Sequence, residues 1–599
     1  MAWYDEAVFY HIYPLGLAGA PKQNDYGEPV HRLNTLLPWV DHIKEIGGSA
    51  LYIGPLFESV GHGYETTDYK KLDSRLGTNE DLTAFVAYCH EQGIKVIFDG
   101  VFNHTGRDFF AFKDIQANRE NSQYKDWYCN VNFWGNNEYN DGFSYDNWGG
   151  YNLLVKLNQK NPAVVDYICD VIRFWVSEFD VDGIRLDAAD VLDFDFMKAL
   201  RRTANEVKPD FWLMGEVIHG DYSRWVNGET LHSVTNYTLH KALYSGHNDH
   251  NYFEIAHTVR RLQNMGTLRL YNFVDNHDVE RIYTKLTNKA HFAPVHVLLY
   301  TLPGVPSIYY GSEFGIEGRK EYGSDDSLRP ALNIEDYKDS VKTNPCTALI
   351  AALGKVRQAV PALSYGSYDE LMLTNRQFAY ARDLDGTRVI VSVNNDDAPA
   401  GMHLAAGNCT AYIGALSGEK VSVQDGHINI TQPANSGEIW VPEGTDLNVK
   451  PVKVVTKTDS EAKTNTEDKA ASETATDAKG NKEAEPKIES KESKDIVTAT
   501  ESADAKKNTT DIEKNTTAAN EVKDSAKDAS AQAAADTPVD PETITVDWSK
   551  SPESMTVPEL QAAILAKLAG NGPVDAQMKK TVTDNIWHDS LVNWLKSFR

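Results

Sequence analysis

Residues Gly183–Asp190 read GIRLDAAD, a short apolar stretch that holds Arg185 and Asp187 two positions apart. Alternate side chains of a strand point to the same side, so this arginine and this carboxylate face the same way. Two interpretations are open: a structural ion pair, or a catalytic carboxylate that a guanidinium keeps ionised. Similar apolar stretches recur along the chain, and their recurrence decides the fold.

Seven more short apolar runs precede or follow this one, and helix-like stretches separate them. One such stretch, NPAVVDYICDVIRFWVSEF, begins at Asn161 and places Pro162 in its first turn, where proline is favoured. The alternation predicts an α/β fold, a parallel (β/α)₈ barrel over residues 1–362. The other runs are Phe9–Pro14, Ala50–Pro55, Lys95–Phe102, Phe211–Val217, Ser233–Tyr237, Leu270–Val274 and Pro306–Gly311.

The chain is long enough for several further parts. Residues 105–158 make the third connection unusually long and are rich in Asn, Gly and aromatics, which predicts a subdomain inserted after the third strand. A period-two pattern over residues 363–446 predicts an all-β sandwich. Residues 447–547 lack aromatic side chains and are rich in charge, so we expect a disordered linker. Helical spacing returns over residues 548–599 and predicts a small helical module.

Charge and composition exclude several classes of protein. The net charge of −27 and the lack of a basic stripe argue against nucleic acid as a partner. No run of 18 apolar residues occurs, so no membrane span is expected. The start MAWYDEAVFYHIYP lacks the basic and apolar regions of a signal peptide, and the five cysteines show no paired spacing. We therefore expect free thiols and a cytoplasmic location, with a leader removed before this start as the alternative.

Polar residues end several of the apolar runs, at the edge of a barrel where active sites lie. Three carboxylates, from the fourth, fifth and seventh runs, are expected to converge there: Asp187, Glu216 and Asp278. The third run ends FDGVFNH and the seventh FVDNHD, which add Asp99, Asn103, His104 and His277. For one such carboxylate alone, a hydrogen-bonded structural role is the better interpretation. Together with two histidines and an arginine, they favour catalysis.

Paired carboxylates carry out glycoside hydrolysis, one as nucleophile and one as general acid and base. The nucleophile has to stay ionised, and Arg185 beside Asp187 lowers the pKa of that carboxyl. The acid requires a raised pKa, and the apolar FWLMG before Glu216 would raise it. The sequence therefore predicts Asp187 as nucleophile and Glu216 as acid and base.

Four motifs in order, DGVFNH, GIRLDAAD, GEV and FVDNHD, resemble those of the α-amylase family, glycoside hydrolase family 13. GYETTDY from Gly63 and GVPSIYYGSEFG from Gly304 resemble two further stretches, and the resemblance covers residues 1–445. It implies a retaining double displacement in which Asp278 binds and distorts the sugar. It further implies that Tyr64 stacks on the sugar, that His104 and His277 bind its hydroxyls, and that Asp99 supports Arg185.

Two features narrow the choice of subgroup within this family. LVKLN at Leu154–Asn158 resembles the MPKLN of neopullulanases, cyclomaltodextrinases and maltogenic amylases, and His62 stands two before Tyr64, as in that group. Exo-acting oligo-1,6-glucosidases carry an Asp where this chain has Gly61. We therefore expect α-1,4-linked maltooligosaccharides or cyclodextrins as substrates. Asp190-Val191 replaces the Asn-Glu of the group, which leaves the product pattern open.

Several alternatives stay open. No cofactor is expected to be required, although Asn103 matches one calcium ligand of α-amylases. The aromatic stretches Trp127–Tyr145 and Trp148–Tyr151 form either a sugar groove or the core of the insertion. The C-terminal module either docks a protein partner or is a marginal helical hairpin. The rival functions are a transglycosylase or isomerase of the same family, and a non-catalytic carbohydrate-binding scaffold.

Overall fold

The computed structural model describes residues 2–266, 269–321 and 324–447, and beyond them only 546, 548, 550–552, 555–569, 582 and 595. The chain divides into two compact units, Met1–Lys479 and Gly480–Arg599, which are described separately. No described helix has the length and apolar character needed to cross a membrane. All five cysteines are free thiols, as expected.

Eight parallel strands form one sheet in the first unit, in the order β11-β10-β9-β5-β2-β1-β13-β12. A parallel bridge between Thr235 and Tyr271 joins the two ends of this sheet, and the Asn236 amide donates to the Tyr271 carbonyl at 2.9 Å. The predicted (β/α)₈ barrel is therefore confirmed, and each predicted run overlaps one strand. The strands are β1 (Phe9–Ile12), β2 (Ala50–Ile53), β5 (Lys95–Gly100), β9 (Gly183–Leu186), β10 (Trp212–Gly215), β11 (Ser233–Val234), β12 (Tyr271–Phe273) and β13 (Val305–Tyr309).

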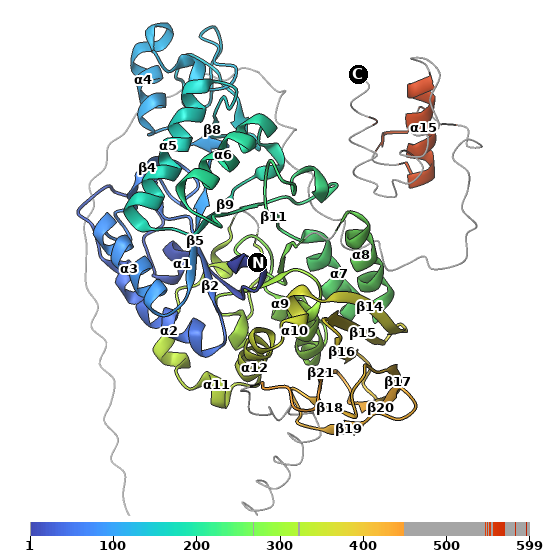
Figure 1. Ribbon diagram of the computed structural model, residues 1–599. Helices are drawn as coiled ribbons and strands as arrows, with labels where there is room; N and C mark the ends of the chain where they lie inside the picture. The colour runs from blue at the N-terminus through green and yellow to red at the C-terminus, as the bar shows by residue number, and fades with distance from the viewer. Residues whose placement is uncertain are drawn as a thin grey trace, which may run out of the picture. The chain divides into compact units, whose positions relative to one another are not determined.

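Helices connect these strands (Figure 1). α5 begins as its sequence predicts: Pro162 is its first residue, and the Asn161 side chain accepts from the Ala163 amide at 2.9 Å. The helices of the first unit outside the insertion are α1 (Pro14–Leu17), α2 (Leu37–Glu45), α3 (Asn79–Glu91), α5 (Pro162–Phe179), α6 (Phe194–Val207), α7 (Tyr237–Asn248), α8 (Tyr252–Asn264), α9 (Ile282–Lys285), α10 (Phe292–Thr301), α11 (Ser340–Thr343), α12 (Pro345–Ala359) and α13 (Ala362–Tyr365).

The inserted segment between β5 and α5 has its own small sheet, in the order β6-β8-β7. Its elements are β6 (His104–Thr105), α4 (Phe110–Asn118), β7 (Asn147–Trp148) and β8 (Tyr151–Lys156). Phe112, Tyr128 and Phe143 are buried in its interior, whereas Trp148 and Tyr151 are exposed. Its aromatic residues thus divide between a core and a surface. A separate hairpin, β3 (Phe57–Ser59) and β4 (Thr66–Leu72), carries Tyr64 in its loop.

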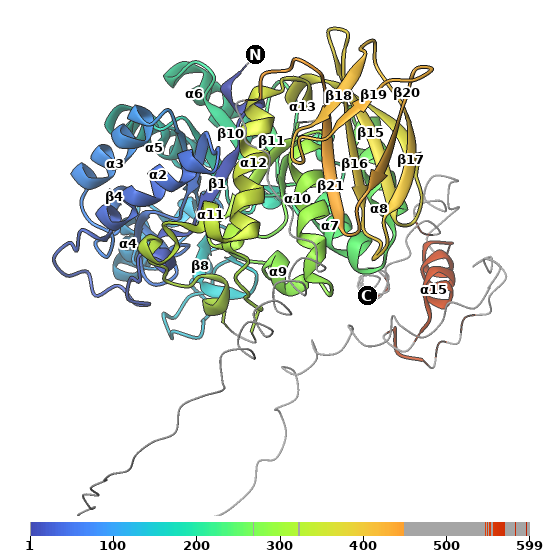
Figure 2. The same cartoon turned by 90° about the horizontal axis from the view of Figure 1, so that it is seen from below.

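Antiparallel strands follow the barrel, as the period-two pattern predicts. Six form the sheet β14-β15-β16-β21-β18-β19, and two form the sheet β17-β20. α10 lies against β16 and β21 (Figure 2), and Thr301 Oγ1 lies 2.5 Å from the Tyr380 hydroxyl. The strands are β14 (Ser367–Leu373), β15 (Gln377–Leu384), β16 (Thr387–Asn394), β17 (Ala400–Ala405), β18 (Ala411–Gly414), β19 (Lys420–Ser422), β20 (His427–Gln432) and β21 (Ser436–Pro442).

In the second unit the structure describes one helix, α15 (Val557–Ala569), where the sequence predicts it. The Thr556 amide donates to Glu559 Oε2 at 2.7 Å, the contact of a helix-capping box. Leu560 and Ile564 are buried on one face of α15. The predicted linker lies almost wholly outside the described residues, as does the rest of the predicted module apart from a few positions.

Candidate active site

Two of the predicted carboxylates, Asp187 and Glu216, lie at the carboxyl ends of adjacent barrel strands. β5 pairs with β9 so that Asp99 stands opposite Arg185, and β9 pairs with β10 so that Leu186 stands opposite Gly215. Asp187 and Glu216 each follow the last residue of their strand, and therefore leave the sheet side by side. The Glu216 amide donates to the Leu186 carbonyl at 2.9 Å, which continues the strand pairing up to the site.

Arg185 is the centre of the cluster. Its Nη1 donates to Asp99 Oδ1 at 2.8 Å and to Asp187 Oδ1 at 3.0 Å. Its Nη2 lies 2.7 Å from Glu216 Oε2. The guanidinium is buried, with 4% of the side chain exposed, so these pairs are poorly screened by solvent. One cation therefore binds three carboxylates from three strands.

The sequence predicts a lowered pKa for Asp187, whereas in the structure this pKa is raised. Burial raises the pKa of Asp187 well above its ordinary value; Arg185 opposes this rise, and the negative charges of Glu216 and Asp99 add to it. Arg185 thus acts in the expected direction, but its charge is shared among three carboxylates. In this arrangement Asp187 holds a proton more readily than an ordinary carboxyl does.

The surroundings of Glu216 are also different from those predicted. Its Oε2 accepts from the Ala188 amide at 3.1 Å besides contacting Arg185, and its Oε1 lies 3.5 Å from the Tyr237 hydroxyl. The apolar residues before it, Leu213 and Met214, are fully buried within the sheet and its helices. The expected apolar setting therefore belongs to the strand, while the carboxyl itself lies among polar groups.

Asp278 forms a second polar cluster with His277 and Arg329. Its Oδ2 lies 3.0 Å from His277 Nε2, and its Oδ1 lies 2.9 Å from Arg329 Nη2. Arg329 Nε also donates to the His277 carbonyl at 3.0 Å. Burial raises the pKa of Asp278, but His277 and Arg329 outweigh it and hold this pKa far below its ordinary value. Asp278 is therefore ionised while Asp187 is prone to protonation.

Tyr64 joins the two clusters. Its hydroxyl donates to Asp99 Oδ2 at 3.1 Å and lies 2.5 Å from His277 Nε2. The Tyr64 ring is parallel to that of His277, with centroids 5.7 Å apart, and Tyr13 stacks on His277 at 5.8 Å. Tyr52 also donates to Asp99 Oδ2, at 2.9 Å. The aromatic side chains thus fix the positions of the polar groups.

His104 and His62 lie near Tyr64. The Asn103 amide nitrogen lies 3.2 Å from His104 Nδ1, and His104 Nε2 lies 3.1 Å from the Tyr64 carbonyl, so both ring nitrogens have partners. A carbonyl only accepts, so Nε2 carries the proton. Burial lowers the pKa of His104 to about 4. A sugar hydroxyl would have to replace one of these contacts. His62 Nε2 lies 3.2 Å from Glu65 Oε1.

An exposed indole borders this part of the site. The Trp148 ring lies 6.2 Å from the His104 ring, and 39% of the residue is exposed. β6 pairs with β8, and β8 with β7, so His104 and Trp148 belong to one small sheet. This placement fits the interpretation of Trp148 as part of a sugar groove, whereas the buried rings of the insertion are core.

The surroundings of Asn103 do not fit a calcium ion. Its Oδ1 is buried and has no hydrogen-bond partner among the described residues, which is one suitable oxygen. Calcium requires six to eight oxygen ligands, with carboxylates among them. The described residues contain no group of three or more His, Cys, Asp or Glu that could hold a metal. The described residues around Asn103 thus offer one free side-chain oxygen and no cluster of carboxylates for such an ion.

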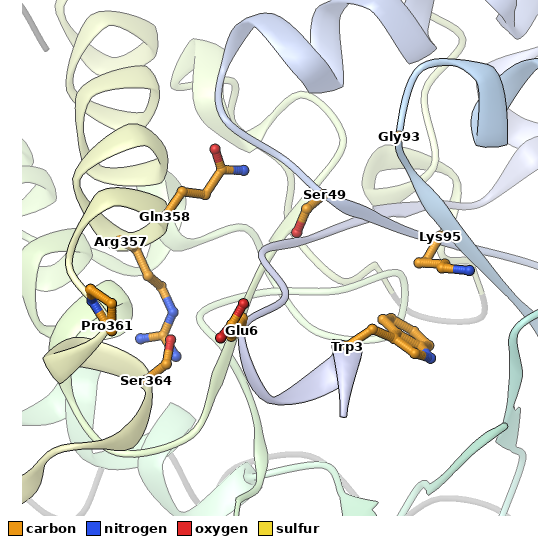
Figure 3. Close-up of a pocket in the computed structure, with 9 residues that line it drawn as sticks. All are labelled: Trp3, Glu6, Ser49, Gly93, Lys95, Arg357, Gln358, Pro361 and Ser364. Carbon is orange, nitrogen blue, oxygen red and sulfur yellow. The ribbon is translucent and has the colours of Figure 1, made fainter. Parts of the chain in front are cut away.

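A cavity of about 380 Å³ lies at the other end of the barrel (Figure 3). Ser49 precedes β2, Lys95 begins β5, and Arg357 and Gln358 come from the end of α12. These are the amino ends of the strands, whereas the carboxylates lie at the carboxyl ends. The cavity is therefore separate from the catalytic cluster.

Four residues of the site were not predicted: Arg329, Tyr237, Tyr52 and Tyr13. Tyr52 is within β2, and its contact with Asp99 follows from the pairing of β2 with β5. Arg329 lies in an irregular segment before α11. Its Nη2 also binds Asp325 at 3.2 Å, and the spacing of four between Asp325 and Arg329 was the available signal.

Comparison with known proteins agrees with this geometry. The catalytic-domain model of the alpha-amylase family matches residues 32–355. A cyclomaltodextrinase from Bacillus sp. is 31% identical over 422 residues, which cover 66% of this chain and 74% of that protein. Neopullulanase 2 from Thermoactinomyces vulgaris is 29% identical over 473 residues, covering 73% and 78% of the two chains.

Solved structures of similar proteins also superpose on this chain. A cyclomaltodextrinase structure superposes with a TM-score of 0.65 at 26% identity, covering 73% of this chain and 78% of that one. The debranching enzyme of Nostoc punctiforme gives a TM-score of 0.63 at 25% identity, covering 73% and 98%. The family model matches more than half of the chain, and its residues include the whole carboxylate cluster. The chain belongs to the α-amylase family, glycoside hydrolase family 13.

Proposed function

We propose that this protein hydrolyses α-1,4-glucosidic bonds of maltooligosaccharides or cyclodextrins with retention of configuration. One observation carries the proposal: Asp187 and Glu216 bind neighbouring nitrogens of the same guanidinium. Two carboxyl groups held this way are close together. Retaining glycosidases need a separation of about 5–5.5 Å, whereas inverting enzymes leave room for a water molecule between the two groups.

In the first step Asp187 attacks the anomeric carbon while Glu216 protonates the leaving oxygen. In the second step Glu216 removes a proton from water, and this water releases the sugar from Asp187. Tyr237 and the Ala188 amide hold the Glu216 carboxyl in place. Asp278, kept ionised by His277 and Arg329, supplies negative charge beside the oxocarbenium-like transition state.

The proton has to be on Glu216 when the reaction starts. Without substrate, Glu216 shares Arg185 with Asp187, and burial favours a proton on Asp187. When Glu216 turns to the leaving oxygen, Arg185 keeps only Asp99 and Asp187 as partners. The guanidinium then stabilises the Asp187 carboxylate, the form that the attack requires, more strongly.

The choice of substrate rests on the relatives. The similar proteins include cyclomaltodextrinases, a neopullulanase and a maltogenic amylase. We assign the same α-1,4 linkage to this chain, with Tyr64, His62, His104 and His277 binding the sugar and Asp99 supporting Arg185. We further propose a cytoplasmic location, no required cofactor, and a protein partner for the C-terminal module.

The test is the time course of products from maltoheptaose and from a cyclodextrin, with Asp187→Asn as the inactive control. We expect maltose and mixed oligosaccharides, whose first-formed anomer is α by proton NMR. β-Anomers would refute retention, and products longer than the substrate would assign the chain to transfer instead. No turnover of either substrate would favour the scaffold alternative. Activity should persist after dialysis against EDTA, and loss restored only by Ca²⁺ would refute the absence of a required cofactor.

The partner of the module has its own test. Full-length protein and a chain ending at residue 547 are compared by cross-linking in cells of the source organism. A partner cross-linked only to the full-length chain supports docking through residues 548–599. Identical cross-linking patterns would refute it without affecting the catalytic proposal.

A further inference from the structure

Arg281 is a fully buried arginine that follows Asp278 by three positions. Its backbone amide donates to the Gly318 carbonyl at 3.1 Å, and its Nη2 donates to the Leu328 carbonyl at 3.1 Å. The residue after Leu328 is Arg329, the partner of Asp278. Arg281 therefore holds both ends of the segment 318–328, which leads directly to Arg329.

The guanidinium of Arg281 also binds the end of β13. Its Nη1 donates to the Tyr310 carbonyl at 2.8 Å and to Ser312 Oγ at 3.0 Å. Ser312 Oγ donates in turn to Asp275 Oδ2 at 2.8 Å. A guanidinium has five N–H donors in one plane, so it can bind groups from several elements at the same time. Arg281 thus links the residues that follow β12 to the end of β13 and to the segment before Arg329.

The backbone on both sides of Arg329 is held in place. The Leu328 carbonyl accepts from the Tyr309 hydroxyl at 2.9 Å, in addition to the bond from the buried guanidinium. The Pro330 carbonyl accepts from the Tyr310 hydroxyl at 2.9 Å. Because the carbonyls before and after Arg329 are both bound to the end of β13, the side chain between them starts from a fixed position.

We propose that Arg281 is a positioning residue for the reaction, because its bond to the Leu328 carbonyl places the Arg329 guanidinium against Asp278. Arg281 has no exposed surface, so it acts through Arg329 and does not contact the sugar itself. Without Nη2 the Leu328 carbonyl keeps only the Tyr309 hydroxyl, and Arg329 loses its exact placement. A misplacement of about 1 Å far from the chemistry can cost about 100-fold in rate. The inference rests on the proposed function, since it explains how that site is held.

The test is a double-mutant cycle between Arg281 and Arg329, measured as kcat/KM for maltoheptaose with the full-length protein. Arg281→Lys keeps the positive charge but cannot bind all the groups that the guanidinium binds. We expect Arg281→Lys to lower kcat/KM about tenfold in the unmodified chain and less than about twofold in Arg329→Gln, because residues that act through one another are not additive. A tenfold loss in both backgrounds would assign Arg281 a general structural role and refute the proposal.

Arg357 provides a matched control. It is 1% exposed and donates to the Tyr300 and Gly304 carbonyls at 2.6 Å each, at the end of the barrel away from the carboxylates. Arg357→Lys should lower the melting temperature, as a change to any buried arginine does, and should change kcat/KM by less than about twofold. A loss of kcat/KM in Arg357→Lys equal to that in Arg281→Lys would show that the effect is not specific to the site.

A second variant and a second measurement keep the proposal testable if Arg281→Lys does not fold. Tyr309→Phe removes only the other hydroxyl donor to the Leu328 carbonyl, and it should show the same coupling to Arg329. Hydrogen exchange of the amides of residues 324–332 requires no turnover. It should be faster in Arg281→Lys or Tyr309→Phe and unchanged in Arg357→Lys, because fewer bonds then oppose local opening.

Exchange that is unchanged in Arg281→Lys and in Tyr309→Phe would refute the positioning role. Absence of turnover by the unmodified chain would instead refute the proposed function, and the exchange rates would still show whether Arg281 holds this segment.

Discussion

At the scale of single residues, the site balances the negative charge of its carboxylates against the positive charge of Arg185 and Arg329. Five carboxyl groups surround two guanidinium groups, and Arg185 alone contacts three of them. Carboxylates that share one cation cannot all ionise without mutual repulsion, so their pKa values separate. Burial raises the pKa of Asp187, whereas Arg329 and His277 hold that of Asp278 low.

The pH dependence of the first chemical step follows from this balance. The negative charge of Glu216 contributes to the raised pKa of Asp187, so Glu216→Gln should lower that pKa. With α-maltosyl fluoride, whose leaving group needs no acid, the acidic limb of kcat/KM should lie above the ordinary range of an aspartate and move to lower pH in Glu216→Gln. The pH profile of kcat/KM is the measurement. Glu206→Gln, an exposed carboxylate paired with Arg173, should leave the limb in place, and an upward shift in Glu216→Gln would contradict the assignment.

Arg329 is one of the four residues of the site that the sequence did not predict. Its guanidinium binds Asp278, Asp325 and the His277 carbonyl, so Arg329→Gln should free Asp278 from its position. We expect kcat/KM for maltoheptaose to fall about 100-fold, since misplacing a transition-state contact has that effect. Arg329→Lys keeps the positive charge but loses the planar set of donors of the guanidinium. Its kcat/KM should therefore lie between those of the unmodified chain and of Arg329→Gln. Arg260→Gln, on an exposed ion pair, is the control; full activity of Arg329→Gln would exclude the role.

At the scale of elements, strand ends account for what the sequence could predict. Asp187, Glu216 and Asp278 were predictable because each follows an apolar run, and the pairing of parallel strands brings such ends together. Arg329 and Tyr237 were not, because one lies in an irregular segment and the other begins α7. Long-range pairing of loops leaves no periodic signal. The same limit applies to Glu216, whose polar partners come from neighbouring strands and loops.

Asp182 anchors the strand that carries the nucleophile. It precedes β9, is 1% exposed, and accepts from the Val96 amide at 2.9 Å, from Lys95 at 2.9 Å and from Lys208 at 2.9 Å. Asp182→Asn should reduce the free energy of unfolding by about 2–3 kcal/mol, since it breaks a largely buried ion-pair network. Urea unfolding followed by circular dichroism measures this. Asp180→Asn also removes a partner of Lys208, but Asp180 is exposed and should change stability by less than about 1 kcal/mol. Equal effects of the two variants would contradict the proposed anchor.

At the scale of the whole molecule, buried neutral histidines limit stability in acid. Burial lowers the pKa of His240 and His247 to about 3 and that of His232 and His296 to about 4. The unfolded chain takes up these protons near pH 6.5, and the folded chain does not. The stability these groups provide is therefore complete above pH 6.5 and lost as the pH falls towards 3. Each should contribute a slope of up to about 1.4 kcal/mol per pH unit; urea midpoints at pH 7.5, 6, 5 and 4 measure it, and a constant midpoint would refute it.

Catalysis should depend only on the first unit. Every residue of the carboxylate cluster lies between Tyr13 and Arg329, so a chain that ends at residue 447 should keep kcat and KM for maltoheptaose within about twofold, because no group that contacts the sugar is removed. Kinetics and melting temperature of the two chains, prepared in parallel, measure this. A loss of kcat with an unchanged melting temperature would show that the removed residues act on the reaction.

The insertion after β5 begins and ends at the site itself. β6 starts with His104, and Lys156 at the end of β8 is its partner in the sheet. A protein engineer who exchanged this subdomain for that of a relative would therefore exchange part of the substrate pocket with it. A graft would keep the original surroundings of His104 only if its junctions left the His104–Lys156 pair unchanged. The β7-β8 hairpin with Trp148 could then be mutated separately to change which sugars the enzyme binds.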